Sequence, residues 1–230
     1  MEKITWITGA GSGIGKAIVE KLSEDKMAMA VSGRRENLLK ELSDAFPAVS
    51  SFPLDITSST DVLNTYNNIS KQGDVSCLVN NAGAVDFNLV EKQSVENIEK
   101  MISVNLLGSI YTIKSVLPGM IERKEGTIIN IISVVAEKIF PNSAAYTAAK
   151  LGLMGFLDVM REEVRKHNIK VVNILPGATA TPIWDEKLRT KFEERMMRPE
   201  DVAETIWGLL KLEGRAVPEK VVLRSVFGDL

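Results

Sequence analysis

Two side chains capable of acid–base chemistry, Tyr146 and Lys150, stand four positions apart in the run SAAYTAAK. The run opens a helical pattern, so positions i and i+4 share one helix face. A free tyrosine has a pKa of about 10, and a nearby ammonium favours the phenolate. The pair is therefore predicted to exchange a proton with a substrate oxygen near neutral pH. The alternative is a structural role, because this spacing is common by chance on helices.

A third polar side chain, Ser133, closes the β-rich run GTIINIIS. It is expected at the carboxyl edge of a sheet, where the ligands of open α/β sheets bind. A hydroxyl there can hydrogen-bond a reacting oxygen, although a cap or turn role is also compatible. The chain has one histidine, His167, and one cysteine, Cys77. A histidine triad, a multi-histidine metal site and a cysteine-rich metal site are thus excluded within one chain, and we predict no metal.

A glycine-rich run, TGAGSGIG, ends the first predicted strand and enters a helical pattern. Glycines permit a tight turn close to a diphosphate, and the helix N-terminus attracts the anion. Its position between strand and helix favours a dinucleotide site over a flexible turn. The fingerprint G-x-G-x-x-G fails, because Ile14 stands where it needs a glycine. The spacing T-G-x-x-x-G-x-G fits instead, through Thr8, Gly9, Gly13 and Gly15.

The end of the second predicted strand indicates which cofactor is preferred. NAD sites usually place a carboxylate there for the ribose 2′-hydroxyl. This chain has Ser32-Gly33-Arg34-Arg35 instead. A guanidinium can bind a 2′-phosphate through two hydrogen bonds. We therefore predict NADP(H) over NAD(H), with Arg34 as the first choice for this contact and Arg35 as the second. The alternative is that both arginines are solvated residues at a helix start.

The elements that must position these residues alternate along the chain. Strands are predicted at Lys3–Thr8, Met27–Ser32, Val49–Leu54, Val75–Asn80, Gly126–Ile132, Ile169–Leu175 and Lys220–Leu223. Helices are predicted at Gly13–Glu24, Glu36–Ala45, Ser58–Ser70, Val95–Arg123, Ser143–Lys166, Asp185–Met197 and Pro199–Leu210. This alternation predicts βαβ units, and hence an α/β fold: a doubly wound Rossmann-fold sheet of seven parallel strands with helices on both faces. No linker interrupts the chain, so residues 1–230 are expected to form one domain.

The composition limits the classes of partner that the protein is expected to bind. The 230 residues are 45% hydrophobic and 25% charged with a formal net charge of −2, which is typical of a globular protein. Nothing indicates a basic face for nucleic acid. The N-terminus lacks a signal-length apolar stretch, and no window is expected to be long enough to span a membrane. The default expectation is a cytoplasmic protein without a membrane partner.

At this point the sequence resembles the classical short-chain dehydrogenase/reductase family. The matching pieces occur in the family's order: TGAGSGIG from Thr8, NNAG from Asn80 to Gly83, Asn105 in VNLLG, Ser133, Tyr146-x-x-x-Lys150, and PGATAT from Pro176 to Thr181. They span most of the chain, and together they are highly specific. The resemblance implies a carbonyl–alcohol oxidoreductase that transfers hydride between the nicotinamide and the substrate carbon.

The resemblance implies a role for each matched position. Tyr146 would be the general acid/base, Lys150 would lower its pKa and hold the nicotinamide ribose, and Ser133 would orient the carbonyl. Asn105 would hold a water in a proton relay through Lys150. The residues expected at the cofactor are Gly9, Gly11, Ser12, Gly13, Ile14, Gly15, Arg34, Arg35, Asp55, Ile56, Asn81, Ala82, Gly83, Tyr146, Lys150, Pro176, Gly177, Thr179 and Thr181. Within this set, Asp55 would contact adenine, and Pro176, Gly177 and Thr181 would position the carboxamide.

The substrate side is less defined. A lid is expected at approximately residues 182–198, opposite a wall formed by residues 134–140. Its apolar residues suit lid packing as well as substrate contact: Ile183, Trp184, Phe192, Met196 and Met197. The tail VPEKVVLRSVFGDL lacks the glycine-rich ending of the ketoacyl reductases and is more similar to the branch with hydroxy-acid dehydrogenases and sepiapterin-type reductases.

Three further expectations remain open on the sequence alone. Small residues on the helix from Ser143, namely Ala148, Ala149, Gly152 and Gly155, favour a homodimer or homotetramer over packing within one chain. A 3-ketoacyl-carrier reductase is the alternative activity within the family. A catalytically silent NADP-binding sensor is an alternative of another class. That alternative predicts loss of Ser133, Tyr146 or Lys150, and all three are present.

Overall fold

The computed structural model describes residues 2–213 and 215–230. Its centre is a parallel sheet of seven strands in the order β3-β2-β1-β4-β5-β6-β7. The strands are β1 (Lys3–Thr8), β2 (Met29–Gly33), β3 (Val49–Pro53), β4 (Asp74–Asn80), β5 (Gly126–Ile131), β6 (Ile169–Pro176) and β7 (Lys220–Leu223). The order reverses between β1 and β4, which is the topological switch point where ligands of such sheets bind.

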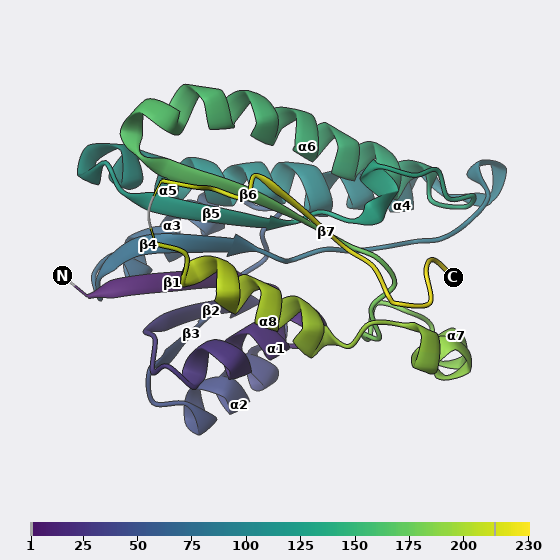
Figure 1. Cartoon of the computed structure of the whole chain (residues 1–230), viewed down its shortest axis with the longest axis horizontal. Coiled ribbons are helices and arrows are strands. Elements are labelled where there is room, and N and C mark those ends of the chain that lie inside the picture. The colour runs from purple at the N-terminus through teal and green to yellow at the C-terminus, as the bar shows by residue number, and fades with distance from the viewer. Residues whose placement is uncertain (1, 214) are drawn as a thin grey trace.

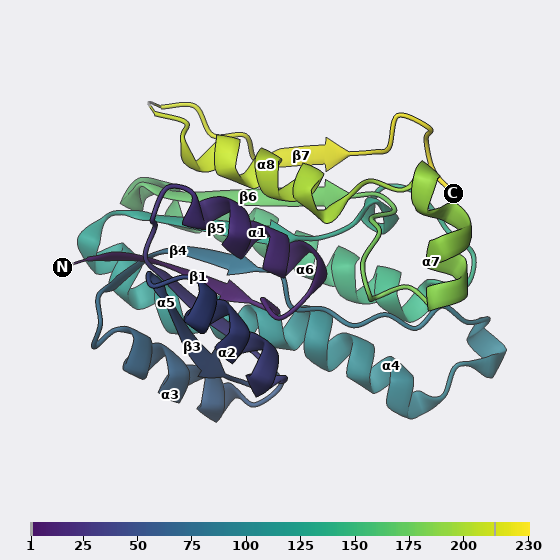
Figure 2. The ribbon, with the colours of Figure 1, turned by 90° about the horizontal axis from the view of Figure 1, so that it is seen from below.

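Helices cover both faces of the sheet (Figure 1). They are α1 (Gly13–Ser23), α2 (Glu36–Ala45), α3 (Ser59–Ile69), α4 (Val95–Ile102), α5 (Ser109–Arg123), α6 (Ala144–Val164), α7 (Glu186–Phe192) and α8 (Pro199–Leu210). The helices α3, α5 and α6 lie on one face, and α1, α2 and α8 lie on the other. The short α7 stands apart from both layers, beside the C-terminal end of the chain (Figure 2).

Two apolar cores separate the sheet from its helical layers. Because successive side chains of a strand point to opposite faces, Leu78 packs toward α3, α5 and α6, while its neighbours Cys77 and Val79 pack toward α1, α2 and α8. Cys77 is thus the small buried hydrophobe expected of a free cysteine. Burial raises the pKa of its thiol to about 12, so Cys77 is a poor nucleophile.

The predicted fold class is confirmed, and most element boundaries agree within two residues. One element differs in kind. The predicted helix Val95–Arg123 is interrupted between α4 and α5 by a wide π-helical segment, Ser103–Gly108. Asn105 lies in this segment. Apolar periodicity alone does not reveal a widened turn. One extra residue in a turn rotates the apolar positions only partly around the helix, so the pattern still looks helical.

The expectation that no window could span a membrane is wrong in one respect. The stretch Val95–Arg123 is long and apolar enough to do so by length and composition. Its apolar side chains nonetheless have partners inside the fold, because Met101, Ile113, Val116 and Met120 are fully buried. This stretch is a core helix of the α/β layer.

Candidate active site

A cavity of about 910 Å³ opens at the carboxyl ends of the strands, next to the switch point between β1 and β4. One end is formed by the glycine-rich loop after β1 and the turns after β2 and β3. The other is formed by the segments after β4, β5 and β6. All residues predicted to contact the cofactor line this cavity except Gly15. Residues far apart in the sequence thus meet at one sheet edge, as expected.

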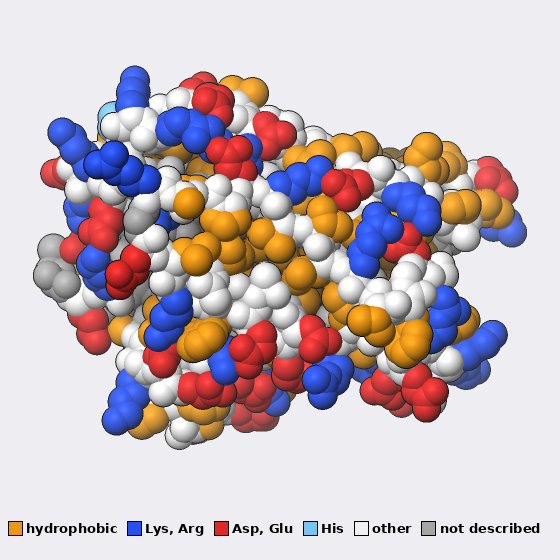
Figure 3. All heavy atoms as spheres, in the orientation of Figure 1, with side chains coloured by type: hydrophobic (Ala, Val, Ile, Leu, Met, Phe, Trp, Pro, Cys, Tyr) orange, Lys and Arg blue, Asp and Glu red, His pale blue; other side chains and the backbone are white. Residues whose placement is uncertain are grey.

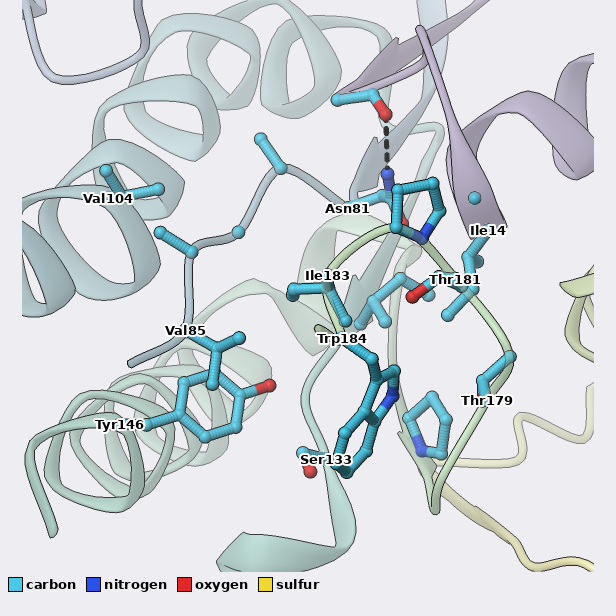
Figure 4. A pocket seen from close by; sticks show the side chains of 18 of the residues that line it. Ile14, Asn81, Val85, Val104, Ser133, Tyr146, Thr179, Thr181, Ile183 and Trp184 are labelled. Carbon is cyan, nitrogen blue, oxygen red and sulfur yellow. Dashed lines mark hydrogen bonds between the residues drawn. The ribbon is translucent and has the colours of Figure 1, made fainter. Parts of the chain in front are cut away.

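The glycine-rich loop holds a conformation that only glycine supports well. Gly9 and Gly13 have φ angles of +66° and +55°. A Cβ on Gly9 would lie 2.7 Å from the Cα of Ala82, so the two segments touch backbone to backbone. The Asn81 side-chain amide donates to the backbone oxygens of Thr8 (3.0 Å) and Gly9 (3.1 Å), and Figure 4 draws one hydrogen bond from this amide. Asn81 therefore shapes the loop from behind, in addition to lining the cavity.

Gly15 is a structural residue of this loop. It does not line the cavity, and a Cβ there would lie 2.4 Å from the backbone oxygen of Gly9 and 2.5 Å from Nδ2 of Asn81. The glycine thus lets α1 approach the loop that it follows. The spacing identified Gly15 correctly as required, but it does not distinguish contact with a cofactor from contact with a neighbouring turn.

The two arginines after β2 both line the cavity and are exposed. The guanidinium of Arg35 donates to the hydroxyl of Ser12 at 2.6 Å, so it leans over the glycine-rich loop. Arg34 lies on the side of Asp55. The Asp55 carboxylate accepts from the backbone N (3.0 Å) and hydroxyl (2.8 Å) of Thr57, and these bonds, with the charge of Arg34, lower its pKa. Two cations are therefore available to an anion at this end of the cavity.

At the other end, Ser133, Tyr146 and Lys150 come together. Ser133 follows β5, and its hydroxyl accepts from the backbone N of Val135 at 3.3 Å. The Tyr146 ring points from α6 into the cavity (Figure 4). Lys150, only 4% exposed, donates to the backbone oxygen of Ile131 at 2.8 Å, with its ammonium 5.7 Å from the centre of the Tyr146 ring. The i, i+4 spacing thus aligns phenol and ammonium as predicted.

The pKa values of Tyr146 and Lys150 differ from those expected from the sequence. Burial raises the pKa of Tyr146 to about 12, and the nearby Ser133 hydroxyl opposes this only in part. Burial also lowers the pKa of Lys150 to about 8. Desolvation disfavours both charged forms and outweighs the attraction between them. The structure does not show the lowered phenol pKa that sequence reasoning expected. A pKa raised to about 12 keeps the phenol neutral near pH 7, and the neutral phenol is the form that donates a proton.

Asn105 does not line the cavity and is fully buried. Its side-chain amide donates to the backbone oxygens of Ala84 (2.8 Å) and Met101 (3.0 Å), and its carbonyl accepts from the backbone N of Ala84 (3.3 Å). The side chain therefore ties the π-helical segment to the chain after β4. Both amide hydrogens of the side chain are used in these bonds, and the water relay expected through Asn105 stays a prediction.

An aromatic group bounds the substrate side. Phe87 stacks on Trp184 with ring centres 5.3 Å apart, and meets the Tyr146 ring edge-on at 6.2 Å. Figure 4 shows Trp184 and Ile183 reaching in from the lid. Of the predicted lid residues, Ile183 and Trp184 line the cavity, whereas Phe192, Met196 and Met197 do not. The two methionines are buried, so lid packing is the correct interpretation for them.

Several lining residues were missed by sequence reasoning: Val85, Phe87, Lys100, Val104, Leu188, Asp229 and Leu230. Val85 and Phe87 had a signal, because they follow β4 and so lie at the same sheet edge. Asp229 and Leu230 had none, because only the path of the chain after β7 brings them to the cavity. On the predicted wall, Val134, Val135 and Phe140 line the cavity, while Ile139 is exposed.

Comparison with known proteins agrees with this geometry. The sequence pattern of the short chain dehydrogenase family matches residues 3–191. A sepiapterin reductase of Chlorobaculum tepidum is 31% identical over 242 aligned positions, which cover 100% of this chain and 99% of that protein. An uncharacterized oxidoreductase of Staphylococcus saprophyticus is 30% identical and is covered to 98%.

Solved structures are similar across the whole chain. Serine dehydrogenase in its closed form, complexed with NADP+, has a TM-score of 0.93 at 28% identity, covering 99% of this chain and 96% of that one. An alcohol dehydrogenase of the archaeon Thermococcus sibiricus, complexed with 5-hydroxy-NADP, has a TM-score of 0.91 at 27% identity, covering 100% and 99%. Fold and site together define a Rossmann-type α/β oxidoreductase. The chain belongs to the short-chain dehydrogenase family.

Proposed function

We propose that the protein is an NADP(H)-dependent oxidoreductase that interconverts a carbonyl compound and a secondary alcohol. The observation that carries this proposal is the meeting of Ser133, Tyr146 and Lys150 at one end of a cavity whose other end holds the glycine-rich loop and two arginines. Hydroxyl, phenol and ammonium are the groups needed to bind a carbonyl oxygen and exchange its proton. A silent sensor would have no need of this group.

The residues present suit a dinucleotide. Gly9 and Gly13, with positive φ angles, shape a turn that lines the cavity next to the N-terminus of α1, where a diphosphate can bind. Arg34 and Arg35 flank the position expected for the adenosine ribose, and two similar structures carry NADP+ or 5-hydroxy-NADP. The bound cofactor supplies the hydride. In this proposal Lys150 holds the ribose hydroxyls.

Proton transfer is the part of the reaction that this chain performs. In the reducing direction, Ser133 donates a hydrogen bond to the carbonyl oxygen and orients it. The neutral Tyr146 gives its proton to the alkoxide as that charge develops, and the phenolate that remains is stabilised by the Lys150 ammonium. Phe87 and Trp184 exclude water from the phenol. The reverse sequence oxidises an alcohol.

The cofactor preference predicts the effect of Arg34→Ala. We expect KM for NADPH to rise at least about tenfold, because charge-assisted hydrogen bonds to a phosphate are each worth about 1.5–3 kcal/mol. KM for NADH, which lacks the 2′-phosphate, should stay unchanged and is the internal control. Initial-rate kinetics with both cofactors check this result. A larger effect of Arg35→Ala would reverse the order of the two arginines, and no effect of either variant on the NADPH/NADH ratio would refute the phosphate site.

The pKa values predict a pH profile. Tyr146, with a pKa raised to about 12, stays protonated throughout pH 6–10, whereas Lys150, with a pKa lowered to about 8, is charged below about pH 8 and neutral above it. The value of kcat/KM for NADPH, which reports the free enzyme, should therefore fall about tenfold per pH unit above about 8. In Lys150→Arg, whose guanidinium stays charged, that limb should disappear. Its persistence in Lys150→Arg would assign it to another group.

The activity itself is tested by NADPH consumption on a panel of 3-ketoacyl thioesters, β-keto and semialdehyde acids, diketones, quinones and steroids. Turnover of at least one compound supports the proposal. A clear preference for the thioesters would favour the 3-ketoacyl-carrier alternative. Binding of NADPH without turnover of any class would favour a sensor. A homodimer or homotetramer and a cytoplasmic location complete the proposal.

A further inference from the structure

The far end of the substrate cavity is formed by the last residues of the described chain. After β7 the segment Arg224–Leu230 turns back toward the lid, and Asp229 and Leu230 line the cavity. The end of this segment lies beside α7 in both ribbon views (Figures 1 and 2). Asp229 is the one acidic side chain on the substrate side of the described lining; the other, Asp55, lies at the adenosine end.

Three cations from three separate elements fix Asp229. The ammonium of Lys138, after the β5 turn, and the guanidinium of Arg224, after β7, both donate to Oδ2 at 2.8 Å. Arg195, at the end of the lid, donates to the Asp229 backbone oxygen at 3.2 Å. The Asp229 side chain is only 12% exposed. Wall, lid and tail are therefore joined at this residue, and its position is well defined.

The two oxygens of this carboxylate differ. Both cations bind Oδ2, while Oδ1 accepts no hydrogen bond from any described side chain or backbone N. Oδ1 is also absent from the polar atoms that are sealed from solvent without a partner, so it stays accessible. Lys138, Arg195 and Arg224 do not line the cavity, whereas Asp229 does. The wall of the cavity thus includes Asp229 and none of the three cations that hold it.

The charges around Asp229 further limit which ligand groups its Oδ1 atom can bind favourably. Three positive side chains surround one negative side chain, and basic groups gather over this part of the surface at the right of Figure 3. A cationic ligand gains little from a carboxylate neutralised in this way. A carboxylate ligand meets the Asp229 oxygen first and is repelled. An uncharged N–H or O–H donor gains a hydrogen bond without either penalty.

We propose that Asp229 is a specificity-determining residue whose free oxygen accepts a hydrogen bond from an uncharged N–H or O–H group at the end of the substrate remote from its carbonyl. The inference rests on the proposed function, since it places the substrate carbonyl at Tyr146. The stacked pair Phe87 and Trp184 lines the same cavity next to Tyr146, so a flat substrate packs best against it. The substrate class is a flat carbonyl compound with a distal neutral donor.

An isosteric series of phenylpropane-1,2-diones tests this proposal. The para substituent is isopropyl, carboxamide, carboxylate or amidinium, which have nearly the same shape and differ in hydrogen bonding and charge. The wild-type protein should favour the carboxamide over the isopropyl compound by about tenfold in kcat/KM, the usual effect of a hydrogen bond to a charged group. The carboxylate and the amidinium should be the poorer members of the polar set.

The variant Asp229→Asn makes the test specific. Lys138 and Arg224 will hold the amide oxygen, so the Asn NH₂ group faces the cavity as a donor. The preference for the carboxamide over the carboxylate should then reverse, because the carboxylate accepts through both oxygens whereas the carboxamide can accept only through its carbonyl oxygen. Lys138→Met is the matched control, because it removes one cation from Oδ2 and leaves Oδ1 and Arg224 in place. It should keep the carboxamide preference.

Binding separates this inference from the proposed function. Calorimetry of the same four compounds with the NADP+-loaded protein gives their order of affinity whether or not they react. If no compound in any class is reduced while the carboxamide still binds best in the wild type and not in Asp229→Asn, the proposed function fails and the Asp229 assignment stands. Equal affinities of the carboxamide and isopropyl compounds, or the same loss in Lys138→Met as in Asp229→Asn, would overturn the Asp229 assignment.

Discussion

Tyr146→Phe is expected to lower kcat for NADPH-dependent reduction by about 10²- to 10⁴-fold, the usual contribution of a positioned general acid. The variant removes one hydroxyl and keeps the ring, so the edge contact with Phe87 and the shape of the cavity remain. The Kd for NADPH should change little, because the phenol supplies proton transfer and most of the cofactor contacts lie elsewhere. A fall in kcat without a comparable change in cofactor affinity is the signature of a group that acts in the transition state.

The measurement is single-turnover NADPH oxidation with the best compound of the panel, paired with fluorescence titration of NADPH. Tyr111→Phe is a suitable control, because it removes a tyrosine hydroxyl from α5, in the same helical layer as α6 but outside the cavity. A Tyr146→Phe enzyme that keeps more than about a tenth of the activity would exclude the phenol as the proton donor.

Gly15→Ala is expected to have the largest effect on cofactor binding and stability. Its Cβ would stand 2.4 Å from the Gly9 backbone oxygen, and the second neighbour, Asn81, holds the same loop by two hydrogen bonds. Neither atom is the free end of a flexible side chain, so the loop or α1 must shift. Overpacking of this kind destabilises by about 1–3 kcal/mol, and sometimes by more. The displaced loop should weaken NADPH binding at least about tenfold.

Gly208→Ala in α8 is the matched control, because a Cβ there meets nothing within 4 Å. The same substitution at this position should leave stability unchanged or raise it by up to about 1 kcal/mol, as expected for glycine to alanine in a helix. Chemical denaturation and NADPH titration of both variants provide the comparison. If Gly15→Ala unfolds at the same denaturant concentration as the wild type and binds NADPH normally, the close approach of α1 to the loop is not required.

The fold followed from local signals in the sequence. Alternating β-rich and amphipathic segments set the strand and helix positions, and the crossover rule set the parallel sheet. The π-helical segment around Asn105, which was not foreseen, is stabilised by tertiary contacts with Ala84, which no local pattern encodes.

Some features of the site could be predicted from the sequence, and others could not. Gly9, Ser133, Tyr146 and Lys150 were found because each lies at a strand end or on a helix face with a fixed spacing. The pKa of Tyr146 was not predictable, because it depends on burial that only the assembled cavity creates. Asp229 was missed for a similar reason, since its position depends on ion pairs with residues up to 91 positions away.

The two ends of the cavity are also formed by different kinds of atoms, and this affects how the sequence of such a protein can diverge. Main-chain atoms in fixed turns form the end with the glycine-rich loop, where a Cβ added at Gly9 or Gly15 would clash with neighbouring backbone. Side chains from segments outside the sheet, among them Phe87, Trp184 and Asp229, line the opposite end. Mutation can therefore remodel this end of the cavity while leaving the glycine-rich loop intact. Relatives named for sepiapterin, serine and alcohol chemistry, all near 30% identity to this chain, are the expected outcome of that division.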